Sequence, residues 1–122
     1  MDIGLHSIGI GVSDLDRAIG FYRDVLGLKL QFSEPAHAYA RFDLGGVNFG
    51  VIGQDMSNPE AAAFTGRHTG VSLSVADLEG AVQTLKARGA RFTMEPTRQP
   101  WGAYMALLSD PDGNIFYLEQ TA

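Results

Sequence analysis

The sequence predicts an α+β fold built from two repeated βαβββ modules. Two segments, about residues 14–26 and 77–88, have the helical spacing of apolar residues, and a glycine follows each of them. A strand-like run precedes each helix, and three more strand-like runs follow it. The two helices align position by position, which indicates an internal repeat. Chance similarity between two amphipathic αβ units is the alternative explanation.

The first module begins with a strand in which small residues alternate with the apolar residues Ile8, Ile10 and Val12. Its helix buries one stripe, made of Leu15, Ala18, Ile19, Tyr22, Val25 and Leu26. Ser13 is expected to cap this helix with Asp16 as its capping-box partner, and Gly27 to end it. Gly45-Gly46 predicts a two-residue hairpin. The three strands that follow the helix are expected at about residues 28–32, 38–44 and 47–52.

The second module repeats this pattern. Its first strand carries Val71, Leu73 and Val75, and its helix buries Leu78, Ala81, Val82 and Leu85. Its later strands are expected at about residues 90–94, 103–109 and 115–120. The halves therefore cover about residues 1–53 and 68–122 of a single domain of residues 1–122. A linker at about residues 54–67 joins them, with one helical turn expected at 60–64.

The bulk composition restricts the class of function. The chain has no cysteine, which excludes disulfides, thiolate metal ligands and a cysteine nucleophile. With 9 Lys+Arg against 14 Asp+Glu and a net charge of -5, it offers no basic patch for nucleic acid. No segment reads as a signal peptide or as a membrane span. We therefore expect a cytoplasmic protein that binds neither nucleic acid nor membrane.

Three motifs give the chain a resemblance to a known family. The first helix reads V-S-D-L-D-R-A-I followed by F-Y and V-L-G-L, and the last turn reads Asp110-Pro111-Asp112-Gly113-Asn114. With Pro100-Trp101-Gly102, these motifs resemble the vicinal oxygen chelate superfamily of glyoxalase I, bleomycin-resistance proteins and extradiol dioxygenases. The resemblance covers almost the whole chain. It implies curved mixed sheets that form a cup, and a homodimer that is either compact or strand-swapped.

Metal-dependent members of this family hold a divalent ion with four His or Glu side chains that face the cup. By the resemblance, these positions fall at Ser7, Gly50, Gly70 and Tyr117. Serine and tyrosine are poor neutral ligands, and glycine has no side chain. We therefore expect no metal and no other cofactor.

The histidines leave one relocated metal site open. His6 is adjacent to Ser7, so it points to the opposite face of a strand. His68 and Glu119 share the face of the cup but lie about 7 Å along their strands from the nearest ligand positions. Together with His37 from a loop, they form the fallback set. Ordinary surface histidines are the simpler explanation.

Strand alternation predicts which residues line the cup. Its floor consists of small residues: Ser7, Gly9, Gly11, Gly70, Ser72 and Ser74. Its walls carry Tyr39, Arg41, Asn48, Gly50, Ile52, Met105, Leu107, Tyr117 and Glu119, with Trp101 near the rim. Such a lining suits a flat, bulky ligand, with Arg41 and Glu119 placed to recognise charge at its edge. Solvent-facing strands, or contact with a dimer partner, explain the same residues equally well, and packing at a strand entry equally explains Trp101.

Three functions remain open. The sequence shows no nucleophile–base pair, no G-x-S-x-G elbow and no phosphate loop, and Glu119 is the sole weak candidate for a general base. The first hypothesis is a metal-free protein that sequesters a small aromatic or amphipathic ligand, as resistance-type members of the family do. The second is a structural or regulatory module whose cup is filled by its partner subunit. The third is a metal-dependent lyase, isomerase or dioxygenase with shifted ligands. We rank them in this order, leaning against catalysis.

Overall fold

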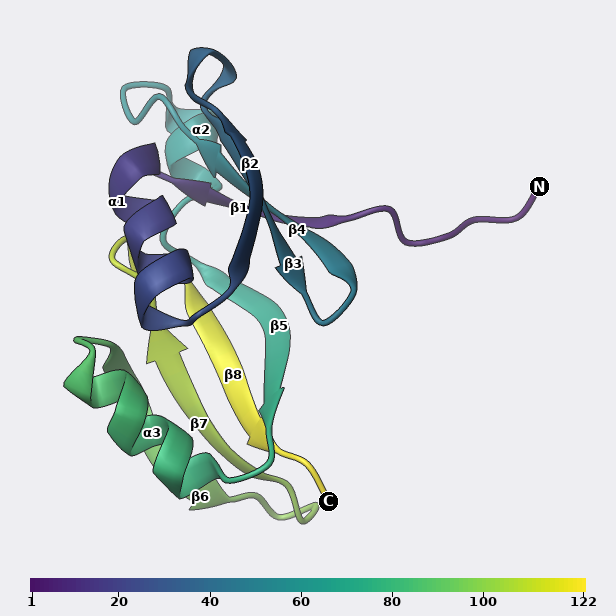
Figure 1. Cartoon of the computed structure of the whole chain (residues 1–122), viewed down its shortest axis with the longest axis vertical. Coiled ribbons are helices and arrows are strands. Elements are labelled where there is room, and N and C mark those ends of the chain that lie inside the picture. Colours follow the sequence, from purple (N-terminus) through teal and green to yellow (C-terminus); the bar gives the residue numbers. More distant parts are fainter. The chain divides into compact units, whose positions relative to one another are not determined.

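A mixed four-stranded sheet occurs twice in the computed structural model, which describes residues 1–122 (Figure 1). The chain divides into two units, Met1–Gly66 and Arg67–Ala122. The strand order is β1-β4-β3-β2 in the first unit and β5-β8-β7-β6 in the second. In each unit the first strand pairs in parallel with the last, and the other neighbours are antiparallel. The two repeated βαβββ modules are confirmed, while their organisation as a single domain stays a prediction.

The first unit contains the elements β1 Ile8–Val12, α1 Leu15–Gly20, β2 Lys29–Glu34, β3 Tyr39–Leu44, β4 Val47–Gly53 and α2 Pro59–Ala63. The residue that caps α1 is Asp14, not Ser13 as expected. Asp14 is the extended residue directly before the helix, and its carboxylate accepts a hydrogen bond from the Arg17 N–H at 3.1 Å. A π-helix, Phe21–Val25, continues α1, and Gly27 follows with a φ of 74°.

The second unit contains the elements β5 His68–Val75, α3 Leu78–Ala87, β6 Arg91–Arg98, β7 Tyr104–Ser109 and β8 Ile115–Gln120. Strand β6 extends four residues beyond the expected end at Met94. Its register with β7 shifts twice, between Phe92 and Met94 and between Met94 and Thr97. Pro96 lies within the second shift, on an edge strand, where a residue without an N–H is tolerated.

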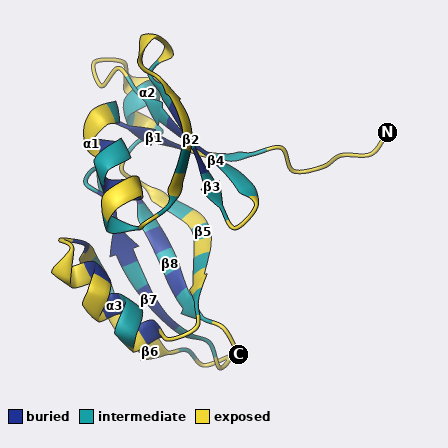
Figure 2. Cartoon of the chain, in the orientation of Figure 1, coloured by how far each residue is buried: buried dark blue, intermediate teal, exposed yellow.

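Helix α1 packs on one face of the first sheet and helix α3 on one face of the second, and the core of each unit lies between its helix and its sheet (Figure 2). In the first unit Tyr22 is fully buried, with its ring centroid 5.3 Å from Phe49 and 6.0 Å from Phe42. In the second unit Leu78 of α3 is buried, as are Leu108 and Phe116 of the sheet. Along β5, exposed and half-buried residues alternate, which shows that the other face of that sheet is not covered by a helix.

The motif before β8 is a buried polar turn. The Asp110 carboxylate accepts hydrogen bonds from the backbone N–H groups of Asp112 and Asn114, and from the Asn114 amide at 2.9 Å. The side-chain oxygen of Asn114 in turn accepts a hydrogen bond from the Arg67 N–H, next to the start of β5. Gly113 takes a φ of 86°. The motif therefore closes the β7–β8 hairpin and anchors β5, which is a structural role.

None of the helices has the length and apolar character that crossing a membrane requires.

Candidate functional site

The uncovered face of the second sheet carries several of the predicted lining residues. Strand register places Ser72 opposite Tyr117 and Leu107 in one row. It places Ser74 opposite Glu119 and Met105 in the next row. Side chains that lie directly opposite one another share a face of the sheet. The predicted residues Ser72, Met105, Tyr117 and Glu119 therefore lie on one face, as strand alternation implied.

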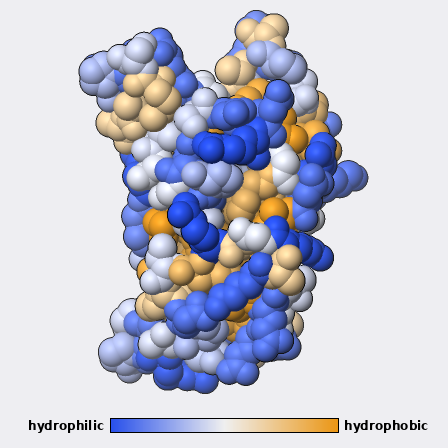
Figure 3. Space-filling model, turned by 90° about the vertical axis from the view of Figure 1, so that its left-hand side faces the viewer, coloured by the Kyte–Doolittle hydropathy of each residue, from blue (hydrophilic) through white to orange (hydrophobic).

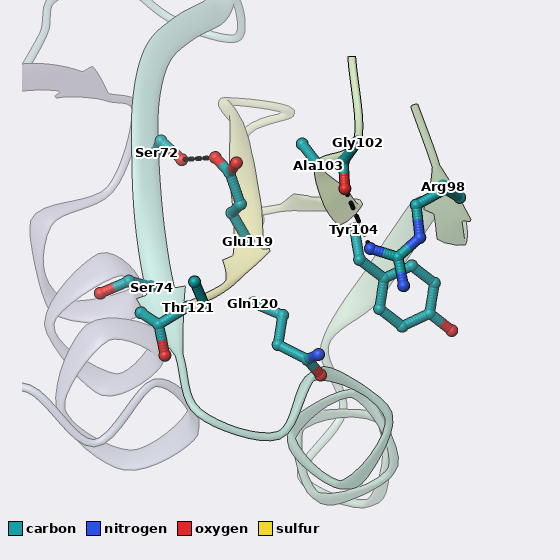
Figure 4. Close-up of a pocket in the computed structure, with 10 residues that line it drawn as sticks. Ser72, Ser74, Arg98, Gly102, Ala103, Tyr104, Glu119, Gln120 and Thr121 are labelled. Carbon is teal, nitrogen blue, oxygen red and sulfur yellow. Dashed lines mark hydrogen bonds between the residues drawn. The ribbon is translucent and has the colours of Figure 1, made fainter. Parts of the chain in front are cut away.

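A hollow of about 530 Å³ opens at one end of this sheet (Figure 4). Its lining comes from the ends of several strands and from the C-terminal residues: Ser72, Ser74, Arg98, Gly102, Ala103, Tyr104, Glu119, Gln120, Thr121 and Ala122. Two residues predicted to bind ligand, Ser72 and Glu119, line this hollow. Met105 and Tyr117 share the sheet face but do not line it.

Two charged side chains lie on opposite sides of the hollow (Figure 4). The Glu119 carboxylate accepts a hydrogen bond from the Ser72 hydroxyl at 3.1 Å. The Arg98 guanidinium donates to the Gly102 carbonyl at 2.9 Å and lies 4.7 Å from the centroid of the Tyr104 ring. A ligand in the hollow would thus meet a carboxylate on one side and a cation stacked on an aromatic ring on the other.

The Tyr104 hydroxyl points out of the hollow. It donates a hydrogen bond to the Glu79 carboxylate of α3 at 2.7 Å. That hydrogen bond, with smaller contributions from burial and from the negative charge of Glu79, holds the pKa of Tyr104 above its ordinary value. The Tyr104 side chain is therefore held by Glu79 at its hydroxyl, while its ring contacts the Arg98 guanidinium.

Trp101 lies in the turn between β6 and β7. The turn is closed by hydrogen bonds from the Gln99 N–H to the Ala103 carbonyl and from the Gly102 N–H to the Gln99 carbonyl. Trp101 is 73% exposed, so it does not pack at the strand entry. It is adjacent to Gly102, which lines the hollow.

Apolar and hydrophilic side chains are interspersed on the face of the molecule that Figure 3 shows.

The uncovered face of the first sheet carries a second group of predicted residues. Arg41 pairs with Gly50 across β3 and β4, and with Phe32 across β2 and β3. Tyr39 lies one row further along the same face. The Tyr39 ring covers Gly50 so closely that a Cβ atom there would lie 3.0 Å from the Tyr39 hydroxyl. Asn48 belongs to this face too, but its amide donates to the His6 carbonyl at 3.1 Å and so holds the N-terminal segment.

The glycine floor of the first sheet is partly covered by the chain itself. Gly11 forms a parallel bridge with Thr65. A Cβ atom on Gly11 would lie 2.6 Å from the Phe64 ring and 2.8 Å from the Phe64 carbonyl oxygen. At this position the close approach that favours glycine is made by the chain's own backbone and not by a ligand.

The positions that the family resemblance gives for metal ligands do not fit a divalent ion. Ser7 precedes β1, and the place of a side chain at Gly50 is taken by the Tyr39 ring. Gly70 has a φ of 74° within a register shift of β5, a conformation that disfavours other residues. The Tyr117 ring packs 4.9 Å from the His68 ring. No group of three or more His, Asp or Glu side chains in the structure could hold a metal ion.

The fallback metal residues are not brought together. His68 pairs with Ile115 and Glu119 pairs with Ser74, at opposite ends of the β5–β8 ladder. Ile115 and Glu119 are four residues apart on β8, which corresponds to about 13 Å. His37 lies in a short 3₁₀ helix, Pro35–His37, with its Nδ1 atom 3.4 Å from a Glu34 carboxylate oxygen. The structure therefore gives no support to a relocated site at His37, His68 and Glu119.

Among the residues at these two places that were not foreseen are Phe32, Arg98 and Tyr104. Phe32 was expected to end its strand, but β2 continues to Glu34. Arg98 lies in the part of β6 beyond the expected end, and Tyr104 lies on the helix-facing side of β7. Pro96 indicates only that this run is an edge strand, and no signal in residues 95–98 predicted that β6 continues to Arg98.

The comparisons with known proteins agree with this architecture. A sequence model of the Glyoxalase/Bleomycin resistance protein/Dioxygenase superfamily matches residues 4–118. Lactoylglutathione lyase GLX1 of Arabidopsis thaliana is 32% identical over 127 aligned positions, which cover 89% of this chain. The chain spans 41% of the length of that relative.

Two solved structures share the fold over nearly the whole chain. A superfamily member from Sphaerobacter thermophilus has a TM-score of 0.81 at 32% identity, with 98% of each chain covered. TnmS3, an antibiotic binding protein from Streptomyces sp. CB03234, has a TM-score of 0.78 at 27% identity, covering 100% of this chain and 99% of TnmS3. By its family match and its doubled βαβββ sheet, the chain belongs to the glyoxalase/bleomycin resistance protein/dioxygenase superfamily.

Proposed function

We propose that the chain is a metal-free binding protein that sequesters a small aromatic or amphipathic molecule. The observation that carries this proposal is the hollow of about 530 Å³ in the second unit. Its size is typical of small-molecule sites, and its lining combines an aromatic ring with a few convergent polar groups. The similarity to TnmS3, an antibiotic binding protein, supports the same function.

The charges of the hollow favour a ligand with a hydrogen-bond donor at one end. Glu119 accepts from Ser72, and a carboxylate has room for further donors. A ligand amine or hydroxyl would bind there, while its ring would lie toward Arg98 and Tyr104. Without a second acid or base beside it, Glu119 serves recognition in this proposal and not proton transfer.

The proposal also covers the oligomeric state, the location and the partners of the protein. We propose a homodimer in the cytoplasm that binds neither nucleic acid nor membrane and needs no cofactor. The excess of acidic residues, with a net charge of -5, supports the absence of nucleic acid. Members of the family that the chain resembles are frequently homodimers, which supports the dimer.

A metal-dependent lyase is the second candidate. The 32% identity to the Arabidopsis lactoylglutathione lyase favours it. The residues at the four positions derived from the family weigh against it, because Gly50 and Gly70 supply no ligand atom and Tyr39 occupies the space at Gly50.

Ligand binding and metal content together test the proposal. Trp101 is the single tryptophan and lies beside the hollow, so its fluorescence reports binding. A panel of planar aromatic amines and quinones should contain a ligand that quenches it, and Glu119→Gln should weaken binding of an amine about tenfold. Glu60→Gln, an exposed carboxylate on α2, is the matched control and should change nothing.

Metal content distinguishes the two candidates. After incubation with zinc, nickel, manganese and ferrous ions and desalting, the binding protein should retain almost no metal. About one ion per subunit, together with no ligand from the panel, would overturn the proposal in favour of the lyase.

A further inference from the structure

Arg41 is held on the uncovered face of the first sheet by two aromatic rings. Its guanidinium carbon lies 5.3 Å from the Phe32 ring centroid and 5.7 Å from the Tyr39 ring centroid. The two rings are 5.9 Å apart, centroid to centroid, and tilted by 50°. The Arg41 Nε–H donates to the Tyr39 hydroxyl at 3.1 Å. We name Phe32, Tyr39 and Arg41 the arginine clamp.

The position of the clamp depends on a glycine. Gly50 lies opposite Arg41, and the Tyr39 ring occupies the space that a side chain at Gly50 would need. The ring therefore lies flat on the sheet, and its hydroxyl reaches the neighbouring arginine. Sheet, ring and guanidinium are in place before any ligand arrives, which lowers the entropy cost of binding.

The charge of Arg41 has no carboxylate partner. Its neighbour on the same strand face, Asp43, accepts the Gly46 N–H at 2.9 Å, and Glu34 lies 3.4 Å from His37. Arg41 is half-buried, yet only its Nε–H is used, so the outer edge of the guanidinium keeps its donors free. A partly desolvated cation of this kind is stabilised by an anion that accepts two parallel hydrogen bonds.

We propose that the arginine clamp is a subsite for the carboxylate of a flat aromatic acid. The carboxylate would accept the paired donors of Arg41, and the ring attached to it would stack on Phe32, which is 39% exposed. This inference rests on the proposed function, because it names a class of small molecule that the protein takes up. It concerns the first unit only and leaves the hollow of the second unit as a separate place of contact.

The test compares 2-naphthoate with its neutral isostere 2-naphthamide on the full chain. The side-chain Nε–H signal of Arg41 in a ¹H–¹⁵N spectrum reports contact at the clamp directly. We expect a saturable shift of that signal with 2-naphthoate, and binding about tenfold weaker for 2-naphthamide.

Three variants separate the clamp from general charge. Arg41→Gln should weaken 2-naphthoate binding about tenfold. Arg41→Lys should weaken it by less, since lysine keeps the positive charge but lacks the paired N–H donors of the guanidinium. Arg91→Gln removes one exposed positive charge from β6 and should leave the affinity unchanged. Tyr39→Phe keeps the ring but frees the Arg41 Nε–H, and it should weaken binding about threefold.

The outcomes are distinct. Equal affinities for 2-naphthoate and 2-naphthamide, with no shift at Arg41, would overturn the clamp. The proposed function would still stand in that case if amines or quinones quench Trp101 in a manner that depends on Glu119. If no aromatic compound binds by either readout, both proposals fail.

Discussion

Replacing Gly50 with alanine is expected to disable the arginine clamp while leaving the fold intact. The new Cβ atom would lie 3.0 Å from both the Cε1 and Oη atoms of Tyr39 and 3.4 Å from its Cζ atom. These distances are shorter than ordinary van der Waals contact, so the ring must move by a few tenths of an ångström. Tyr39 is only half-buried and can tilt outward, which carries its hydroxyl away from Arg41.

Two opposing contributions determine the effect on stability. Loss of the hydrogen bond between Arg41 and Tyr39 costs about 1 kcal/mol, and weaker cation–π contacts cost about 0.5 kcal/mol more. Alanine in place of a strand glycine reduces the freedom of the unfolded chain and returns about 0.5–1 kcal/mol. The free energy of unfolding should therefore change by less than about 1 kcal/mol. The affinity for 2-naphthoate should fall about fivefold or more, since the donors of Arg41 are no longer aligned.

Gly9→Ala is the matched control for this change. Gly9 pairs directly with Gly50 across β1 and β4, but a Cβ atom on it would meet the Ile52 Cδ1 atom at 3.3 Å and would have no Tyr39 atom within 4 Å. Urea unfolding followed by circular dichroism gives the stability of both variants, and titration with 2-naphthoate gives the affinity. The reasoning about the Tyr39 ring would be refuted by one combined result. In that result Gly50→Ala keeps the wild-type affinity for 2-naphthoate, and its free energy of unfolding changes by the same amount as that of Gly9→Ala.

The remaining predictions concern the second unit. Asn114→Ala leaves the buried Asp110 carboxylate short of a donor and should lower the free energy of unfolding by about 2–3 kcal/mol in urea. Asp77→Ala removes the N-cap of α3 and should cost about 1 kcal/mol in the same assay. The raised pKa of Tyr104 favours its neutral form in the folded state. Its contribution to stability is therefore complete below about pH 10 and lost as pH rises through the folded-state pKa. Tyr104→Phe should flatten that decline when unfolding is measured from pH 8 to 11.

Each of these has a result that contradicts it. An Asn114→Ala protein as stable as the wild type would mean that the turn is not held by the Asp110 network. Unchanged stability in Asp77→Ala would show that another group caps α3. If the stability of Tyr104→Phe declined above pH 10 as steeply as that of the wild type, the decline would come from a different titrating group.

The repeated architecture follows from local signals in the sequence. Helical spacing, the alternation of Ile8, Ile10 and Val12, and the glycines after each helix all act over a few residues. Gly45 and Gly46 both adopt positive φ in the expected hairpin. For the same reason the helix that follows Asp14 and the strand from Ile115 to Gln120 lie where the pattern placed them.

Features that depend on pairing between strands were less predictable. Strand β6 continues past two register shifts to Arg98, which lines the hollow, and no local pattern of residues 90–98 indicates this. The shift of β5 at Gly70 depends in the same way on its partner β8. Register is determined by what lies across the ladder, so a single strand does not encode it.

The sequence by itself determined the doubled βαβββ fold and which residues of β3, β4, β7 and β8 share the face away from the helices, because alternation is a property of the strand itself. Only the tertiary structure decided what those residues do to one another. It placed the Tyr39 ring over Gly50, the chain's own Phe64 over Gly11, and Ser72 against Glu119. These contacts join residues 11 to 53 positions apart in the chain, and such proximity arises only when the sheet assembles.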